Sequence, residues 1–277
     1  KALACASRIQ GVLQLKPTLK HARDDRAGDS DVAVAFDDVT LQYKNAGEPS
    51  LEHISFTVPR GSVVGIIGGT GSGKSSLVSL IPHFYDVKDG RVSVFGKNVC
   101  AYDDEDLRHR IGYVQQKAVL FQGTVRSNLL WGDDSASDDD LRTALSTAQV
   151  LDIVADKGGL DAPVEQNGAN FSGGQKQRLS VARALVRKPQ ILVLDDSSSA
   201  LDYATEAAMR KAILALPYQP TLFIVSQRAS SVMCADRILV LEDGRLVGEG
   251  THKELLANCP AYSEIYHSQF SEEVTDA

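Results

Sequence analysis

The sequence predicts an α/β fold organised around a parallel sheet. Several short apolar runs lack polar alternation, as expected of strands that are buried on both faces. These runs are Val63–Ile67, Ile191–Leu194, Leu222–Val225 and Ile238–Leu241. They alternate with segments of helical character, and strands that alternate with helices indicate a parallel α/β core.

The first residues precede the predicted core. Lys1 to Leu15 has apolar residues near helical spacing, and Pro17 is expected to end this helix. Residues 20–31 are charged and lack large apolar groups, which is typical of a linker. We therefore place the boundary of the folded domain at Val32, with residues 1–31 outside it.

Short strands joined by turns are predicted between residues 32 and 99. Val32–Phe36, Val39–Tyr43 and Ile54–Val58 are the first three. Asp89-Gly90 is a turn pair that should open a hairpin continuing through Arg91–Phe95.

Helical patterns follow Gln116 and form a block of about residues 117–187 inserted into the core. Its clearest helices are Asp138–Ala148 and Gly173–Arg187. Asp243-Gly244 closes the last apolar strand, and C-terminal helices are expected over about 251–270.

The composition excludes some classes of protein. The chain has 277 residues, a net charge of -7 and a pI near 5.4, which argues against a nucleic-acid binder. Crowded acidic residues at 103–106 and 133–140 are expected at solvated loops and helix N-termini. The four cysteines are widely separated, without a CxxC pair or a histidine at metal-ligand spacing, so we expect free thiols and no zinc site. Neither an apolar stretch of membrane-spanning length nor the layout of a secretory signal is present in the sequence.

A phosphate-binding loop is the most specific motif. Gly68-Gly69-Thr70-Gly71-Ser72-Gly73-Lys74-Ser75 fits G-x-x-x-x-G-K-[ST], directly after a buried strand and before an amphipathic segment. The glycines let backbone N–H groups turn toward phosphates. Lys74 is expected to reach the β- and γ-phosphates, and Ser75 to ligate Mg²⁺. We expect ATP and Mg²⁺ as the ligands, with Ser76 beside them.

A second magnesium ligand is expected from another strand. Ile191–Leu194 places Asp195 at the exposed end of a central strand, which is the Walker B arrangement. Ser172-Gly173-Gly174-Gln175 stands about 20 residues before this aspartate and begins a helix. With these three motifs, residues 32–257 resemble the ATP-binding-cassette (ABC) ATPases.

The resemblance implies a fold and a set of roles. The fold is a RecA-like P-loop core with an antiparallel β subdomain and an inserted α-helical subdomain. Tyr43 matches the aromatic residue that stacks on adenine. Gln116 matches the glutamine that contacts Mg²⁺ and the attacking water, with Gln115 as the less favoured register, and Ser199–Asp202 matches the D-loop. Two such domains sandwich two ATP molecules head to tail, so Ser172–Gln175 serves the ATP of a partner domain.

Two residues depart from the family pattern. Asp196 stands where a glutamate normally polarises the attacking water, and its side chain is one methylene shorter. A general base acts within about 2.6–3.2 Å of its target, so the shorter carboxylate should fall short. Gln227 stands in place of a histidine and cannot become a cation. We expect a site that binds ATP and hydrolyses it slowly.

The Ser172–Gln175 motif keeps the family pattern, which suggests a different half-transporter as partner, as in heterodimeric bacterial multidrug-type exporters. Residues 1–31 resemble the end of a last transmembrane helix and its linker, and an unrelated amphipathic helix is the alternative. The expected location is therefore the cytoplasmic face of a membrane, bound to the transmembrane domain. A homodimeric slow ATPase and a non-transport ABC interaction module are the alternative functions.

Overall fold

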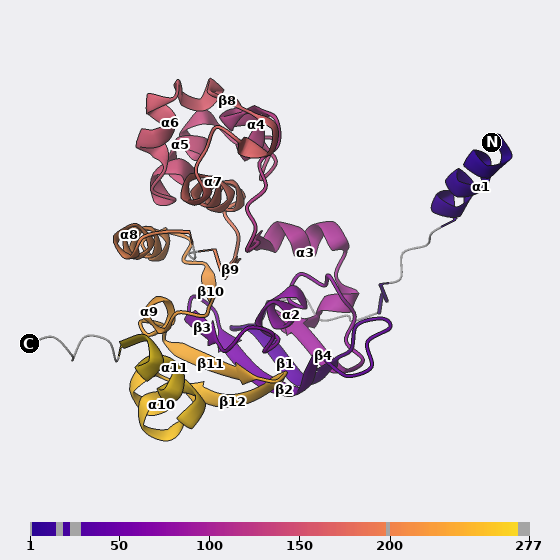
Figure 1. Cartoon of the computed structure of the whole chain (residues 1–277), viewed down its shortest axis with the longest axis vertical. Coiled ribbons are helices and arrows are strands. Elements are labelled where there is room, and N and C mark those ends of the chain that lie inside the picture. The colour runs from indigo at the N-terminus through magenta and orange to yellow at the C-terminus, as the bar shows by residue number, and fades with distance from the viewer. Residues whose placement is uncertain (1, 15–18, 23–28, 198–199, 271–277) are drawn as a thin grey trace, which may run out of the picture.

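A six-stranded, mainly parallel sheet forms the centre of the protein. The computed structural model describes residues 2–14, 19–22, 29–197 and 200–270 (Figure 1). The strand order is β12-β11-β3-β10-β9-β6, and every neighbouring pair is parallel except β11 with β12. These strands are β3 (Val63–Ile67), β6 (Ile111–Val114), β9 (Ile191–Asp195), β10 (Thr221–Ser226), β11 (Arg237–Glu242) and β12 (Arg245–Gly250). The predicted α/β class is confirmed.

Strand β3 is buried along its whole length because both faces of the sheet are covered. Val64 and Ile66 point into one core, which is shared with a second, antiparallel sheet. Val63 and Ile67 point into the opposite core, which continues into the helices. This alternation follows from the two-residue period of a strand, so each apolar side chain of β3 finds a packed environment.

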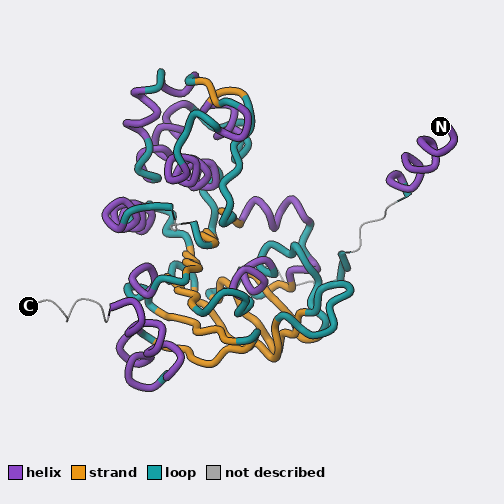
Figure 2. The backbone as a smooth tube through the Cα atoms, viewed as in Figure 1, coloured by secondary structure: helices purple, strands orange, loops and turns teal. Residues whose placement is uncertain are grey.

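The second sheet is antiparallel, in the order β2-β1-β4-β5, and it packs beside the parallel sheet (Figure 2). Its strands are β1 (Val32–Leu41), β2 (Leu51–Pro59), β4 (Asp89–Val94) and β5 (Lys97–Asn98).

Two details of the predicted strands are wrong. The two strands expected over residues 32–43 are one strand, β1, which kinks at Asp38 (φ 49°) where its pairing register shifts. Asp89-Gly90 is not a turn but the start of β4; the hairpin turn lies at Phe95-Gly96. The register shift between β1 and β4 beside Asp38 brings the two backbones close together. Only glycine fits at position 90, because a Cβ there would lie 2.2 Å from the Asp38 carbonyl oxygen.

Four helices gather at one end of the molecule, and one of them packs against the edge strand β6 of the parallel sheet (Figure 1). They are α4 (Val125–Leu130), α5 (Asp138–Thr147), α6 (Leu151–Asp156) and α7 (Gly173–Val186), with a small β7–β8 pair (Gly123–Thr124 and Pro163–Val164). Ser137 caps α5 and is followed by three aspartates, and Asp103 caps α3 (Asp104–Arg110). These parts of the acidic stretches therefore lie at helix N-termini, as predicted.

The other helices flank the parallel sheet or precede it. They are α1 (Ala2–Leu13), α2 (Lys74–Ser79), α8 (Tyr203–Leu214), α9 (Ala229–Val232), α10 (His252–Asn258) and α11 (Pro260–Phe270), with 3₁₀ turns at Val99–Ala101, Gly159–Asp161 and Gln166–Gly168. Helix α1 leaves Ile9, Val12 and Leu13 more than 60% exposed. Pro17 and residues 23–28 of the predicted linker lie outside the described residues. None of the helices that the structure describes has both the length and the apolar character to cross a bilayer.

We predict that Gly65→Ala destabilises the protein by about 1–3 kcal/mol because the core there is already filled. An added Cβ would lie 2.6 Å from Cβ of Val232 and would push α9 away from β3. Denaturant unfolding measures the change. Gly47→Ala is the matched control, since Gly47 is exposed and has nothing within 4 Å of the new methyl group. Equal stability of the two variants would contradict the packing argument.

Candidate functional site

A polar cleft lies at the carboxyl ends of β3, β9 and β10, the edge of an α/β sheet where ligands characteristically bind. Its volume is about 680 Å³. The cleft is lined by residues from four separate segments of the chain, all of which the sequence predicts as site residues. They are Thr70, Gly71, Gly73, Lys74, Ser75, Ser76, Gln116, Asp195, Asp196 and Gln227. The remaining loop residues, Gly68, Gly69 and Ser72, contact Lys74.

The phosphate loop runs from β3 into α2 and depends on backbone that a side chain would disturb. Gly73 precedes the helix in a left-handed conformation (φ 96°). A Cβ at this position would lie 2.9 Å from the Ser50 carbonyl oxygen. The loop is therefore held closely against residues that precede β2, and only glycine fits at Gly73.

Lys74 is folded back into the loop. Its ammonium group donates to the carbonyl oxygens of Gly68 (2.9 Å) and Gly69 (2.6 Å). Burial lowers the pKa of Lys74, while the negative charges of Asp196 and Asp195 oppose that shift. A phosphate group entering the cleft would offer this buried cation stronger, charged acceptors than carbonyl oxygens.

Ser75 and Asp195 meet across the cleft. The Ser75 hydroxyl donates to Oδ1 of Asp195 (2.9 Å), and the Tyr113 hydroxyl donates to Oδ2 (2.9 Å). Burial raises the pKa of Asp195, and these two hydrogen bonds oppose the rise. Burial, together with the Asp195 charge, also raises the pKa of Tyr113. Hydroxyl and carboxylate oxygens are the ligands that Mg²⁺ prefers, so this pair fits the ion.

Two further side chains face the same space. The Gln116 amide donates from Nε2 to Oδ2 of Asp196 (2.8 Å). Gln227 lies beside the phosphate loop, where its Oε1 accepts from the Thr70 hydroxyl (3.3 Å). With Asp196, these two glutamines line the part of the cleft beside the phosphate loop. The three residues follow three different strands, β6, β9 and β10.

Tyr43 lies at the margin of the cleft. Its hydroxyl donates to Oγ of Ser76 (2.9 Å), and its ring makes an edge-on contact with Tyr85 at a centroid distance of 4.9 Å. The ring is half-buried and adjoins the loop. Its stacking on adenine remains a prediction.

The Ser172–Gln175 motif lies at the N-terminus of α7 and does not line the cleft. Ser172 and Gln175 bond reciprocally in a capping box. Gly174 is required by close packing, since a Cβ there would lie 2.9 Å from the Ala200 carbonyl oxygen. Ser199, the first residue of the predicted D-loop, lies outside the described residues, whereas Asp202 caps α8.

The sequence analysis missed three residues that position the site. Tyr113 holds Asp195, and buried Gln177 of α7 donates to the carbonyl oxygen of Gln115, beside Gln116. Gln269 of α11 stabilises the backbone around Gln227 through two hydrogen bonds. Its Nε2 donates to the Gln227 carbonyl oxygen (2.8 Å), and its Oε1 accepts from the Ala229 amide (2.8 Å). No local motif marks these residues because their partners lie 40 to 82 positions away.

The fold and the cleft together define a P-loop nucleotide-binding domain. Comparison with known proteins identifies the family. Residues 51–199 match the ABC transporter family model, which is more than half of the chain, so the chain belongs to the ABC transporter family as a nucleotide-binding domain. Domains of this family are ATPases.

The relatives include ATP-binding proteins of ABC exporters. An ABC transporter ATP-binding protein of Bacillus subtilis, YfiB, is 43% identical over 88% of this chain and 42% of its own length. The ATP-dependent lipid A-core flippase of Haemophilus ducreyi is 39% identical over 86% of this chain and 41% of its own length. A bacterial Atm1-family ABC exporter solved with ATP bound superimposes with a TM-score of 0.90 at 32% identity, over 97% of this chain and 47% of that one. The chain spans less than half the length of each of these relatives.

We predict that Asp195→Asn abolishes Mg²⁺-dependent ATP binding while leaving the empty protein at least as stable. Burial disfavours the ionised carboxylate, and asparagine removes the charge but keeps the shape. The raised pKa means that native Asp195 is protonated more readily than the unfolded residue. Its unfavourable effect on stability therefore grows as the pH rises from the unfolded pKa to the higher native pKa.

Thermal unfolding of the unchanged protein and of the Asp195→Asn variant at several pH values measures the effect on stability. Calorimetric titration with ATP, with and without Mg²⁺, measures the effect on binding. A melting temperature that falls in the variant would contradict the burial argument. Retained Mg²⁺ dependence would contradict the assignment of the metal ligand.

Proposed function

We propose that this chain is the Mg-ATP-binding motor domain of one half of an ABC exporter. The observation that carries the proposal is the 2.9 Å hydrogen bond between Ser75 and Asp195, which brings two oxygen ligands for Mg²⁺ together beside Lys74. Tyr43 would stack on the adenine, Lys74 and the loop amides would hold the phosphates, and Gln116 would add a third oxygen to the metal.

Head-to-tail pairing with a second nucleotide-binding domain follows from the separation of the two motifs. Ser172–Gln175 begins the 14-residue helix α7, and its own chain's cleft does not include it. The N-terminus of a helix favours negative charge, and its first amide N–H groups donate hydrogen bonds to phosphate oxygens. In the proposed dimer this motif contacts the γ-phosphate of the ATP held by the partner's phosphate loop.

The chain's own site would hydrolyse ATP slowly. Asp196 replaces the usual glutamate, and its Oδ2 is bonded to the Gln116 amide, which would otherwise turn to Mg²⁺ or water. Gln227 can accept or donate a hydrogen bond but carries no positive charge toward the γ-phosphate. Loss of general-base catalysis lowers rates by about 10²–10⁴-fold. A different half-transporter with glutamate and histidine at these positions would then contain the efficient site, completed by Ser172–Gln175 of this chain.

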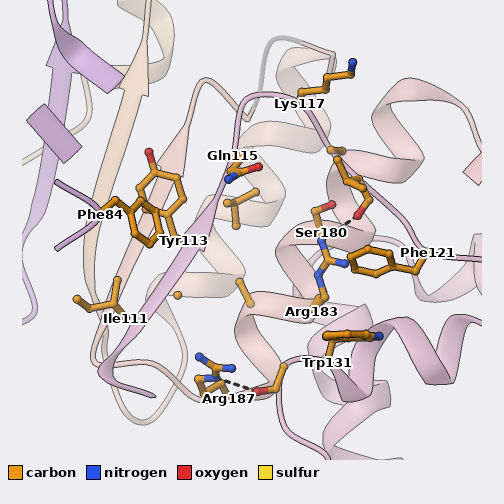
Figure 3. A pocket seen from close by; sticks show the side chains of 16 residues that line it. Phe84, Ile111, Tyr113, Gln115, Lys117, Phe121, Trp131, Ser180, Arg183 and Arg187 are labelled. Atoms are coloured by element: carbon orange, nitrogen blue, oxygen red, sulfur yellow. Dashed lines mark hydrogen bonds between the residues drawn. The ribbon is translucent and has the colours of Figure 1, made fainter. Parts of the chain in front are cut away.

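An aromatic pocket of about 350 Å³ suits a docking segment of the transmembrane domain (Figure 3). Phe121 and Trp131 lie side by side at a ring distance of 5.0 Å and are 46% and 66% exposed, and Arg183 lies over Phe121. Exposed aromatic and arginine side chains of this kind are characteristic of protein interfaces.

This pocket is connected to the magnesium ligands by direct contacts. Phe84 and Tyr113 line it with ring centroids 5.4 Å apart, and the Tyr113 hydroxyl bonds Asp195. A segment that moves in the pocket would therefore displace groups around the nucleotide. The exporter relatives support a membrane partner and a location at the cytoplasmic face of a membrane.

The double variant Asp196→Glu with Gln227→His tests the proposed site. The longer carboxylate reaches the attacking water and the imidazole supplies a positive charge, so we expect ATP turnover to rise at least about tenfold. Steady-state phosphate release measures the change. The same double variant carrying Lys74→Ala is the control and should show no gain.

Two outcomes would count against the proposal. If the double change produces no gain, Asp196 and Gln227 do not explain slow hydrolysis. Near-ordinary turnover by the unchanged chain alone would favour the homodimeric ATPase.

A further inference from the structure

Three potential metal ligands from separate parts of the chain meet at the junction between residues 19–22 and the antiparallel sheet. His83 and Asp86 follow α2, and Cys100 lies in the 3₁₀ turn after β5. One ligand atom of each lies within 4.8 Å of the other two. His83 is 3% exposed, and Asp86 and Cys100 are partly buried.

We propose that His83, Asp86 and Cys100 form a Zn²⁺ site that is separate from the nucleotide cleft. Imidazole nitrogen, carboxylate oxygen and thiolate sulfur are the three ligand types that proteins use for zinc. Zinc distances of about 2.0–2.3 Å place tetrahedral ligands about 3.4–3.6 Å apart, so shifts of about 1 Å bring these atoms into place. One thiolate and one carboxylate balance the charge of the ion.

The groups around the cluster support the ligands. Nε2 of His83 lies 3.0 Å from Oδ1 of Asp86, and the Lys20 amide donates to both oxygens of that carboxylate. With the metal on Oδ1, the Lys20 amide stays on Oδ2 as the outer partner that orients the ligand. Burial raises the pKa of the Cys100 thiol, so zinc must displace a proton there.

The site would stabilise the contact between residues 19–22 and the folded domain. The Lys20 amide bonds Asp86, and the Ala22 amide bonds the Cys100 carbonyl oxygen (2.9 Å). Two of the three ligand residues therefore already hold residues 19–22. The His21 ring lies 6.5 Å from that of His83 and is close enough to approach the fourth position. A bound ion would make this junction more rigid.

The spacing of cysteines and histidines along the chain predicts no zinc site. The nearest histidine ligand, His83, stands 17 positions before Cys100, outside the spacing of known motifs. The folded chain brings the two together through the hairpin of β4 and β5. The proposal therefore differs from that expectation and depends on the tertiary structure.

Cobalt titration of the full chain tests the site. The chelator-treated, reduced protein is titrated with Co²⁺ in the absence of nucleotide, and then with Zn²⁺ in competition. We expect one equivalent of Co²⁺ with a thiolate-to-metal charge-transfer band, which oxygen ligands of the nucleotide cleft cannot produce. Cys100→Ser and His83→Gln should each weaken binding more than about 100-fold, since even an outer partner contributes about 10–100-fold.

Cys234→Ser is the matched control, because Cys234 is an exposed free thiol away from the cluster, and it should bind like the unchanged protein. Equal melting temperatures of the Cys100→Ser and Cys234→Ser variants exclude misfolding as the cause. No charge-transfer band, or a band that persists in Cys100→Ser, would overturn the proposal. As a second measurement, Zn²⁺ should slow hydrogen exchange at the Lys20 amide in the unchanged chain and in Cys234→Ser but not in Cys100→Ser. Exchange that Zn²⁺ does not slow in the unchanged chain would overturn the stabilising role at this junction.

Discussion

The hydrogen bond between Ser75 and Asp195 is the interaction around which the nucleotide cleft is arranged, and it depends on the register of the parallel sheet. Strand β10 lies between β3 and β9, pairing Ser226 with Ile67 and Val225 with Asp195. This register brings the phosphate loop, the Asp195 carboxylate and the residues after β10 to one edge. A shift of one residue would turn Asp195 to the other face of the sheet.

Holding these charges in the cleft has a cost in stability. Both Lys74 and Asp195 are desolvated. Burial lowers the pKa of Lys74 and raises the pKa of Asp195, and both shifts favour the neutral form of the side chain. The protein compensates with local hydrogen bonds from Ser75 and Tyr113 and with the carbonyl oxygens around Lys74. A bound Mg-ATP would replace these internal partners with full charges, so the cleft is suited to a charged ligand.

The fold class and the nucleotide motifs could be predicted from the sequence because their signals are local. A buried apolar strand, the glycine spacing of the loop and the aspartate that ends β9 are each visible in a short window. The kink in β1 and the true turn at Phe95-Gly96 were not predicted, because pairing with β4 decides them. Tyr113, Gln177 and Gln269 were missed for the same reason. Each acts on a partner that only the tertiary structure brings near.

Single-turnover hydrolysis measures whether the cleft holds Mg-ATP and hydrolyses it slowly. The chain, in excess over radiolabelled Mg-ATP, is quenched over time and the bound nucleotide is separated into ATP and ADP. An ordinary enzyme turns over at about 10 s⁻¹, so loss of the general base predicts about 0.001–0.1 s⁻¹ with ATP still bound. Conversion to ADP at about 10 s⁻¹ would contradict the account, as would failure to retain ATP when Mg²⁺ is present.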